Sequence, residues 1–462
     1  MGRVTSGYPR FVVHPFSRQL AGHVVATTPS LAGRTVWLTS SRRMADALAD
    51  ALASLTAEAR SFSDGDVSGL SHPVSAEISG RAKTYLQNIG GFLSSRQAES
   101  ELLRRGLLAT LVSEKLFGGD AAAEVRRVLR HGIPGTADAD LLLAPSGMNA
   151  IYAAFRASAE LQAKRGRTVW LQLGWLYLDT IAILKKFTSS PADYVYVRDP
   201  LDREGLERIF RKHGHQIAGV FAELPTNPLI QTPDVGSLAA LCRKHGAHFL
   251  IDPSVVSFFN VDILRHADVV VSSLTKYTAS EGDLTAGVVA INPESPDATE
   301  LRRRAAAEVE PVYPRDLARL AAQIGATETV LARIHANTKA VVAFLEAHPK
   351  VRDVFWALHP ASRKNYLRIA RTPDATGGMI SFTLHGSMDP FYDKLRLPKG
   401  PSFGMKTTLI CPFMYLAHYD LVTTPAGIAE LAASKLDPDL LRLCCGTEPV
   451  DEIIGALREA LE

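Results

Sequence analysis

The sequence predicts an α/β fold, with a large domain built on a mostly parallel β-sheet and a smaller C-terminal α+β domain. Seven short, nearly continuous apolar runs lie between residues 140 and 291, as expected for strands buried on both faces. Segments with helical spacing of apolar residues separate several of these runs, and this alternation is typical of a parallel sheet covered by helices. The chain has 462 residues, of which 46% are hydrophobic, which is enough for two or three domains with filled cores.

The N-terminal part, residues 1–110, is expected to be an arm followed by helical material. Residues 44–55 and 97–111 both space their apolar side chains as helices do. The large domain is assigned to residues 111–300. Its expected strands are residues 140–144, 168–173, 194–197, 217–224, 248–251, 268–271 and 286–291. A helix should follow the first strand as far as Ala163, and Leu238, Leu241, Cys242 and His245 have the spacing of one buried helix face.

The C-terminal domain is assigned to residues 301–462. It should begin with one long helix, residues 317–347, which ends at His348-Pro349 because the residue before a proline disfavours helical geometry. The remainder mixes strand and helix patterns, as an α+β domain does.

Composition and charge exclude several classes of partner. The formal net charge is only +3 and the clearest basic cluster is Arg302-Arg303-Arg304, so no nucleic-acid partner is expected. No apolar run is long enough to span a bilayer, so no membrane association is expected. The four cysteines form no C-x-x-C pair, which predicts no metal site and a reduced, cytoplasmic protein.

The first chemical motif follows the expected strand at residues 140–144. Ser146-Gly147-Met148 opens a helix there, and its small residues leave backbone N–H groups and a hydroxyl free to face an anion. If the motif stood alone, a simple helix cap by Ser146 would be the favoured interpretation.

Two further motifs follow later strands. Asp252 comes at the end of one strand and could cap a turn or hold a proton on a heterocyclic nitrogen. Lys276 follows the next strand in Ser273-Leu274-Thr275-Lys276 and is a candidate imine-forming amine, although a lone lysine is more often a surface residue. Because the ends of parallel strands share one edge of a sheet, the three motifs should converge. Together they suit pyridoxal 5'-phosphate (PLP), which has a phosphate, a pyridine nitrogen and an aldehyde.

The same four residues also match the S-x-x-K motif of penicillin-binding proteins. The chain contains neither S-D-N nor K-T-G, so the other parts of that active site are missing. It also contains no G-x-G-x-x-G, Walker A, H-E-x-x-H or G-x-S-x-G motif.

Several strings in order resemble the Cys/Met-metabolism family of fold-type I PLP enzymes, over most of the chain from about Leu141. These strings are Glu223-Leu224-Pro225-Thr226-Asn227-Pro228, Asp252 and Ser273-Leu274-Thr275-Lys276. The likeness is greatest to the longer, fungal-type cystathionine γ-synthases, and it rests on residues 7–11, 174–180, 260–262, 401–404 and 417–419.

The resemblance implies a role for each matching residue. Lys276 would hold PLP and later move protons, Asp252 would keep the pyridine nitrogen protonated, and Asn227 would contact the ring hydroxyl. Arg442 would bind the substrate carboxylate with help from Ser402, since the guanidinium geometry suits that task and its apolar flanks argue against a surface residue. The phosphate would be held by Ser146, Gly147, Met148, Ser273 and Thr275.

The sequence departs from the family pattern at two places. Leu173-Gly174-Trp175-Leu176 stands where most members have Tyr-Gly-Gly-Thr, so Trp175 or Tyr177 either replaces the tyrosine that stacks on the ring or belongs to the core. Tyr177 is therefore also a candidate catalytic residue. Ser94-Ser95-Arg96 replaces the Tyr-x-Arg that a neighbouring subunit lends, and Arg96 could still reach the phosphate. Tyr8-Pro9-Arg10 offers the same residue types far upstream.

The activity that the resemblance implies is a transferase reaction of transsulfuration and methionine biosynthesis. Cysteine would replace the acyl group of an O-acylated homoserine to give cystathionine. The alternatives are a γ-lyase, γ-replacement with sulfide or a carbon acid, and a PLP fold without catalysis, against which the intact Lys276, Asp252 and Arg442 argue. The resemblance also implies small amino-acid substrates and a homodimer or homotetramer with shared active sites.

Overall fold

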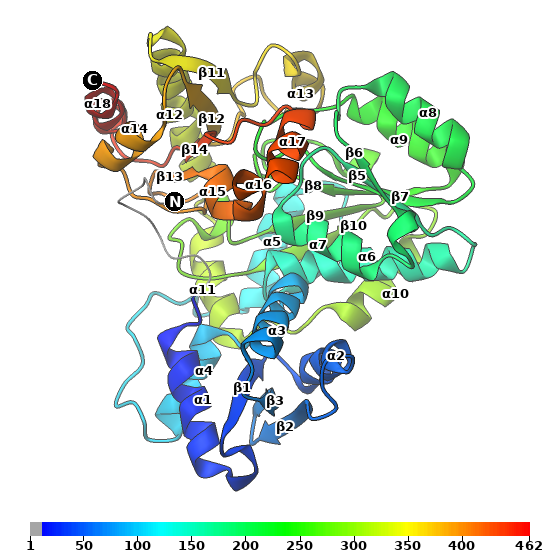
Figure 1. Cartoon of the computed structure of the whole chain (residues 1–462), viewed down its shortest axis with the longest axis vertical. Helices are drawn as coiled ribbons and strands as arrows, with labels where there is room; N and C mark the ends of the chain where they lie inside the picture. The colour runs from blue at the N-terminus through cyan, green and yellow to red at the C-terminus, as the bar shows by residue number, and fades with distance from the viewer. Residues whose placement is uncertain (1–11) are drawn as a thin grey trace.

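The structure is a computed structural model that describes residues 12–462. In Figure 1 the N-terminal part forms a lobe below the rest of the chain, coloured blue, and the C-terminal part lies above, coloured yellow to red. The predictions of a mostly parallel central sheet and of a C-terminal α+β arrangement are both confirmed.

The central sheet has seven strands in the order β4-β10-β9-β8-β7-β5-β6. Their bounds are β4 Leu141–Ala144, β5 Val169–Leu173, β6 Tyr194–Val197, β7 Ile217–Glu223, β8 His248–Asp252, β9 Val269–Ser273 and β10 Gly287–Ile291. All seven expected strands are therefore confirmed. Strand β10 is antiparallel to both of its neighbours, and the other pairs are parallel. Every residue of β7, β8 and β10 is buried, which explains their continuous apolar sequences.

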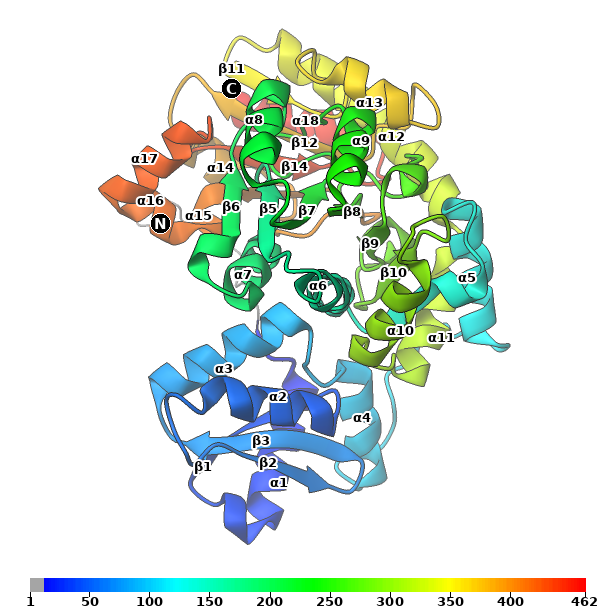
Figure 2. The same cartoon turned by 90° about the vertical axis from the view of Figure 1, so that its right-hand side faces the viewer.

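Helices cover both faces of this sheet, as Figure 2 shows. They are α5 Ala121–Gly132, α6 Gly147–Ala163, α7 Leu178–Phe187, α8 Arg203–His213, α9 Val235–His245 and α10 Ala298–Glu308. Alternate side chains of β8 pack toward opposite faces: Leu250 belongs to the core with α6, α7 and α10, and Phe249 and Ile251 belong to the core with α5, α8 and α9.

The N-terminal lobe contains the helical material predicted for it and, in addition, a three-stranded antiparallel sheet that the sequence patterns did not predict. Its elements are α1 Pro15–Thr27, β1 Arg34–Thr39, α2 Arg42–Leu52, β2 Arg60–Asp64, β3 Val67–Pro73, α3 Ala76–Ile89 and α4 Ser95–Arg104. The strands are short and rich in Ser, Thr and Arg, and they lack the apolar runs of the central sheet. Helix α4 ends at Arg104, before Gly106 with φ +72°, and does not continue to residue 111 as expected.

The C-terminal part contains a four-stranded antiparallel sheet in the order β11-β12-β14-β13. Its elements are α11 Pro314–Ile324, α12 Thr327–Ala347, β11 Val351–Phe355, α13 Arg363–Ile369, β12 Met379–Leu384, α14 Asp389–Lys394, β13 Leu409–Pro412, α15 Phe413–Ala417, α16 Tyr419–Thr423, α17 Pro425–Ala433, β14 Leu441–Cys444 and α18 Val450–Leu461. The single helix expected over residues 317–347 is two helices. Gly325 ends the first, and the Thr327 hydroxyl donates to the Ile324 carbonyl at the break (2.6 Å).

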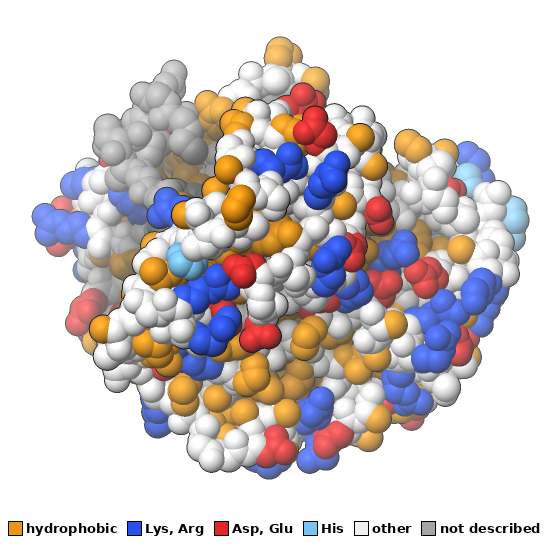
Figure 3. Space-filling view, turned by 90° about the horizontal axis from the view of Figure 1, so that it is seen from below, with side chains coloured by type: hydrophobic (Ala, Val, Ile, Leu, Met, Phe, Trp, Pro, Cys, Tyr) orange, Lys and Arg blue, Asp and Glu red, His pale blue; other side chains and the backbone are white. Residues whose placement is uncertain are grey.

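Within residues 12–462, no helix is long and apolar enough to cross a membrane. The surface seen from below in Figure 3 carries acidic and basic side chains interspersed with apolar ones.

Candidate active site

Several of the predicted site residues lie at the carboxyl ends of strands of the central sheet. Ser146 follows β4, Tyr177 follows β5 and Asn227 follows β7, while Asp252 ends β8 and Lys276 follows β9. These strand ends share one edge of the sheet, where open α/β sheets bind their ligands.

Five residues form what we call the anion cradle: Ser146, Gly147, Met148, Ser273 and Thr275. Ser146 caps α6, because its hydroxyl accepts from the Asn149 amide (3.1 Å). An α-helix provides no internal acceptor for its first amides, so those of Gly147 and Met148 suit an anion. A Cβ atom on Gly147 would lie 2.7 Å from Ser273 Cβ, so only glycine allows this approach. The Thr275 hydroxyl accepts from Ala286 N (3.2 Å) at the edge of the cradle.

Lys276 carries the amine of the site. Its Nζ donates to Ser402 Oγ (2.9 Å) and lies 4.7 Å from the centre of the Phe403 ring. Burial, assisted by the positive charge of Arg442, lowers the pKa of Lys276 to about 8. About a tenth of this amine is therefore neutral and nucleophilic at pH 7, far more than for an ordinary lysine.

Asp252 forms a buried carboxyl pair with Glu223, which lies opposite it in the register of β7 and β8. Burial raises the pKa of Asp252 to about 6, against the opposing effect of hydrogen bonding by Ser254, whose amide donates to Oδ1 (2.8 Å). Burial and the charge of Asp252 raise the pKa of Glu223 well above its usual range. Glu223 is therefore the neutral member, and Asp252 is the member available to carry charge beside a cation.

Glu223 was not among the predicted site residues. Its Oε1 accepts the backbone N–H of Tyr177 (2.5 Å), so it fixes the turn after β5 beside Asp252. A sequence signal existed, because a single acidic residue ends the otherwise apolar run of β7.

Arg442 lies on β14 and is 5% exposed. Its Nη1 donates to Asn227 Oδ1 (3.1 Å) and its Nη2 donates to the Pro401 carbonyl. The guanidinium also lies over the ring of Phe413 at 4.7 Å. These contacts fix its orientation, and its remaining N–H groups can bind a carboxylate. The structure therefore brings together Lys276, Ser402, Arg442 and Asn227 in one set of contacts.

Arg96, a predicted cofactor-binding residue, pairs with carboxylates of this chain instead. Arg96 uses all three guanidinium nitrogens within the chain, on Glu114 (2.8 Å), Asp316 (3.1 Å) and Asp283 (3.2 Å). A phosphate at Arg96 would have to compete with these carboxylates. The alternative pair, Tyr8 and Arg10, lies outside the described residues.

Trp175 packs against the cluster that contains Phe413 and Met414 of the C-terminal part. Its indole N–H donates to His418 Nε2 (3.1 Å), and the two rings are edge-to-face with centroids 5.0 Å apart. It also contacts Tyr196 edge-to-face at 6.1 Å. Of the two aromatic candidates, Tyr177 is therefore the one whose backbone is tied to the Glu223–Asp252 pair.

The described residues fit PLP. The partly buried amine of Lys276, with its lowered pKa, suits the aldehyde of PLP. The buried carboxyl group of Asp252 suits the ring nitrogen, and the N-terminus of α6, which Ser273 approaches closely at Gly147, suits the phosphate. The buried guanidinium of Arg442 adds a group for the carboxylate of an amino acid.

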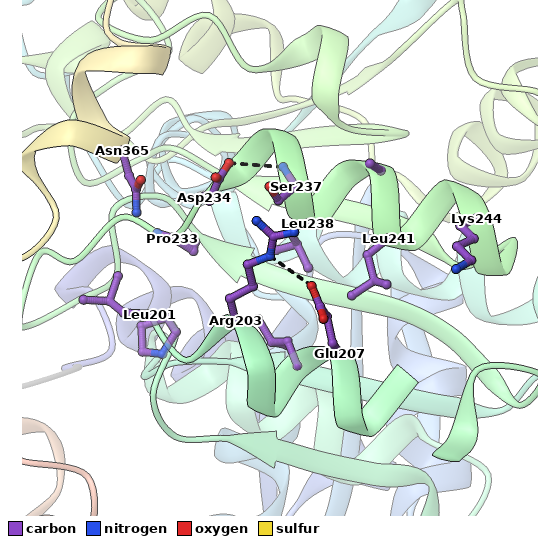
Figure 4. A pocket seen from close by; sticks show the side chains of 13 residues that line it. Leu201, Arg203, Glu207, Pro233, Asp234, Ser237, Leu238, Leu241, Lys244 and Asn365 are labelled. Carbon is purple, nitrogen blue, oxygen red and sulfur yellow. Dashed lines mark hydrogen bonds and ion pairs between the residues drawn. The ribbon is translucent and has the colours of Figure 1, made fainter. Parts of the chain in front are cut away.

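A cavity of about 300 Å³ lies elsewhere, between α8 and α9 (Figure 4). Among its lining residues, Arg203 pairs with Glu207 (2.9 Å) and Asp234 accepts from the Ser237 amide (3.1 Å). It contains none of the predicted site residues.

Comparison with known proteins identifies the family. Residues 126–462 match the family model described as "Cys/Met metabolism PLP-dependent enzyme". The chain belongs to this family. The predicted resemblance and the predicted PLP cofactor are therefore confirmed.

Two curated relatives differ in how much of the chain they match. The L-2-amino-4-chloropent-4-enoate dechlorinase/desaturase of Streptantibioticus cattleyicolor is 36% identical over 460 residues, which cover 100% of this chain and 91% of that protein. The cystathionine γ-synthase of Neurospora crassa is 30% identical over 372 residues, which cover 79% of this chain but 59% of that longer protein.

Solved structures of family members share the fold. The cystathionine γ-synthase of Xanthomonas oryzae pv. oryzae superposes with a TM-score of 0.63 at 21% identity, covering 77% of this chain and 89% of that chain. The fold is thus that of fold-type I PLP enzymes, as predicted.

Proposed function

We propose that this chain eliminates a leaving group from C4 of a 2-amino acid, and that its substrate is a five-carbon 2-amino acid with chlorine at C4. The observation that carries the proposal is the extent of the match to the dechlorinase/desaturase. That match covers the whole chain, including residues 1–125, which precede the family model.

The site residues support this chemistry. PLP, when bound, supplies a ring that stabilises negative charge at Cα of the amino acid. Asp252 would hold the proton on the ring nitrogen, and Arg442 would bind the substrate carboxylate. Lys276 removes a proton from carbon, since its pKa of about 8 suits a base near neutral pH. Lys276 would take the proton from Cα and then one from C3. The C3–H electrons would form the new multiple bond between C3 and C4, the chlorine would leave as chloride with the electrons of the C4–Cl bond, and a proton would return to the carbon skeleton.

A second candidate is cystathionine γ-synthase activity, in which cysteine replaces the acyl group of an O-acylated homoserine. The Neurospora crassa relative supports it. So does the hydrogen bond from Lys276 to Ser402, because Ser402 belongs to the 401–404 string that resembles fungal-type cystathionine γ-synthases. Both candidates use the same carboxylate-binding and proton-moving residues.

One substrate panel distinguishes them. The PLP-loaded protein is given 2-amino-4-chloropent-4-enoate, or O-acetyl-, O-succinyl- or O-phosphohomoserine, each with and without cysteine, and products are identified by mass spectrometry and chloride assay. Chloride release without cysteine is the expected result. Cystathionine formed only with cysteine, and no chloride release, would overturn elimination in favour of the synthase. Oxobutyrate from a homoserine ester regardless of cysteine would indicate a general γ-lyase.

We also propose a homodimer or homotetramer. The segment 107–117 supports this, because it exposes five large apolar side chains by 36–60% each: Leu107, Leu111, Val112, Leu116 and Phe117. The segment is nonetheless anchored, since the Val112 amide donates to Glu99 (2.6 Å) and the Phe117 amide donates to Ala318 O (3.1 Å). Such a fixed apolar strip suits an interface. Light scattering that gave a monomer at micromolar concentration would refute it.

A further inference from the structure

We propose that the N-terminal lobe is part of the cofactor site: the end of α3 packs on the first turn of α6 and holds the anion cradle, with Asn149 as a positioning residue. Figure 2 shows α3 facing α6 and α7 across the boundary between the lobe and the central sheet. The family model begins at residue 126, so α3 lies outside the matched region. The inference rests on the anion cradle used in the proposed function.

Asn149 joins three parts of the chain and is fully buried. Its Nδ2 donates to the Ile89 carbonyl at the end of α3 (3.2 Å). Its Oδ1 accepts from the Glu310 amide (2.9 Å), in the segment before α11. Its backbone N donates to Ser146 Oγ (3.1 Å). These bonds fix the first turn of α6, whose amides must point at the phosphate to bind it.

Gly90 gives an independent observation of the same contact. It caps α3 with φ +66°, and a Cβ atom there would lie 2.4 Å from Ser146 Oγ and 2.6 Å from Asn149 N. A backbone atom cannot yield as a flexible side chain can, so any larger residue must displace the first turn of α6. The lobe therefore touches the cradle directly at Gly90.

Hydrogen bonds to α7 fix the same end of α3. Asp179 is 1% exposed and accepts from Gln87 Nε2 (2.8 Å) and Asn88 Nδ2 (2.8 Å). Since α7 begins directly after Tyr177, α3 contacts the first turns of two helices that follow strands of the site.

The test compares Gly90→Ala with Gly106→Ala. Gly106 has a similar φ of +72°, but a Cβ atom there meets nothing within 4 Å, so this control shares the backbone strain without the contact. Affinities of the apoproteins for PLP and for pyridoxal, which lacks the phosphate, are measured by absorbance titration. For Gly90→Ala we expect PLP affinity to fall about 10- to 100-fold, the loss of one charge-assisted hydrogen bond, with pyridoxal affinity unchanged. The control should match the wild type.

Unchanged PLP affinity in Gly90→Ala would overturn the inference, and so would an equal loss for both aldehydes. Asn149→Ala provides a second variant without a steric clash, and it should show the same selective loss while the apoprotein still unfolds cooperatively. If the wild type itself bound PLP no more tightly than pyridoxal, the cradle assignment would fail, and the role of the lobe with it. If the wild type bound PLP and pyridoxal as expected but released no chloride, the result would instead count against the proposed reaction alone.

Discussion

Replacement of Arg442 by alanine should abolish recognition of the substrate carboxylate. Arg442 is 5% exposed and is held by Asn227, Pro401 and the Phe413 ring, so its remaining N–H groups are oriented in advance. A two-point pair with a carboxylate contributes two charge-assisted hydrogen bonds of about 1.5–3 kcal/mol each. Binding should therefore weaken by about 3–6 kcal/mol, or roughly 10²- to 10⁴-fold. Arg442→Lys keeps the charge but loses the paired geometry, so it should recover only part of this.

The assay uses a matched pair of ligands, 2-aminopent-4-enoate and but-3-en-1-amine, which differ only in the carboxylate. Their binding to the PLP-loaded protein is followed by the visible spectrum, which requires no turnover. The wild type should prefer the amino acid strongly, and Arg442→Ala should bind both ligands about equally. Arg396→Ala is the control, because its side chain is 82% exposed. An Arg442→Ala protein that kept the wild-type preference would refute the carboxylate assignment.

Three further predictions concern titration and stacking. The alkylation rate of Lys276 in the apoprotein, measured by peptide mass spectrometry, should level off near pH 8, whereas an ordinary lysine levels off near 10.5. Hydrogen bonding by His248 lowers the pKa of Asp297. The contribution of Asp297 to the free energy of unfolding is therefore fully present above about pH 4 and is lost as the pH falls further. Asp297→Asn should thus cost about 1–3 kcal/mol in urea unfolding at pH 7, and the gap should close in acid. Trp175→Phe should leave the visible spectrum of bound PLP unchanged, whereas Tyr177→Ala should shift it; the reverse would make Trp175 the stacking residue.

The central sheet could be predicted because burial on both faces leaves a strong sequence signal. Strands such as β7 and β8 are wholly buried and therefore apolar throughout. The rule that parallel strands end at one edge then predicted the neighbourhood of Ser146, Asp252 and Lys276 without any contact information. The family resemblance added Asn227, Ser402 and Arg442, which the structure joins by hydrogen bonds to one another or to Lys276 and Pro401.

The features that sequence could not supply depend on tertiary contacts. The β2–β3 hairpin of the lobe has few apolar residues, and only Asp64-Gly65 marks its turn. Trp175 follows a strand of the site, yet its partner His418 is 243 residues away in sequence. Arg96 resembles a phosphate ligand by position, but the carboxylates that engage it come from three separate segments.

The proton chemistry of the site favours elimination over replacement. Chloride is a weak base and leaves without a proton, so elimination requires one base that removes protons from carbon. Replacement by cysteine also requires the thiol, with a pKa near 8.5, to be deprotonated beside C4. Within residues 12–462, the groups that contact Lys276 or Arg442 include Ser402, Phe403, Asn227, Phe413 and the Pro401 carbonyl, none of which is a base near neutral pH. The carboxylate that acts on Lys276, Asp252, is assigned to the ring nitrogen. Lys276 alone would then have to remove protons both from carbon and from the thiol, whereas elimination requires it to remove protons only from carbon.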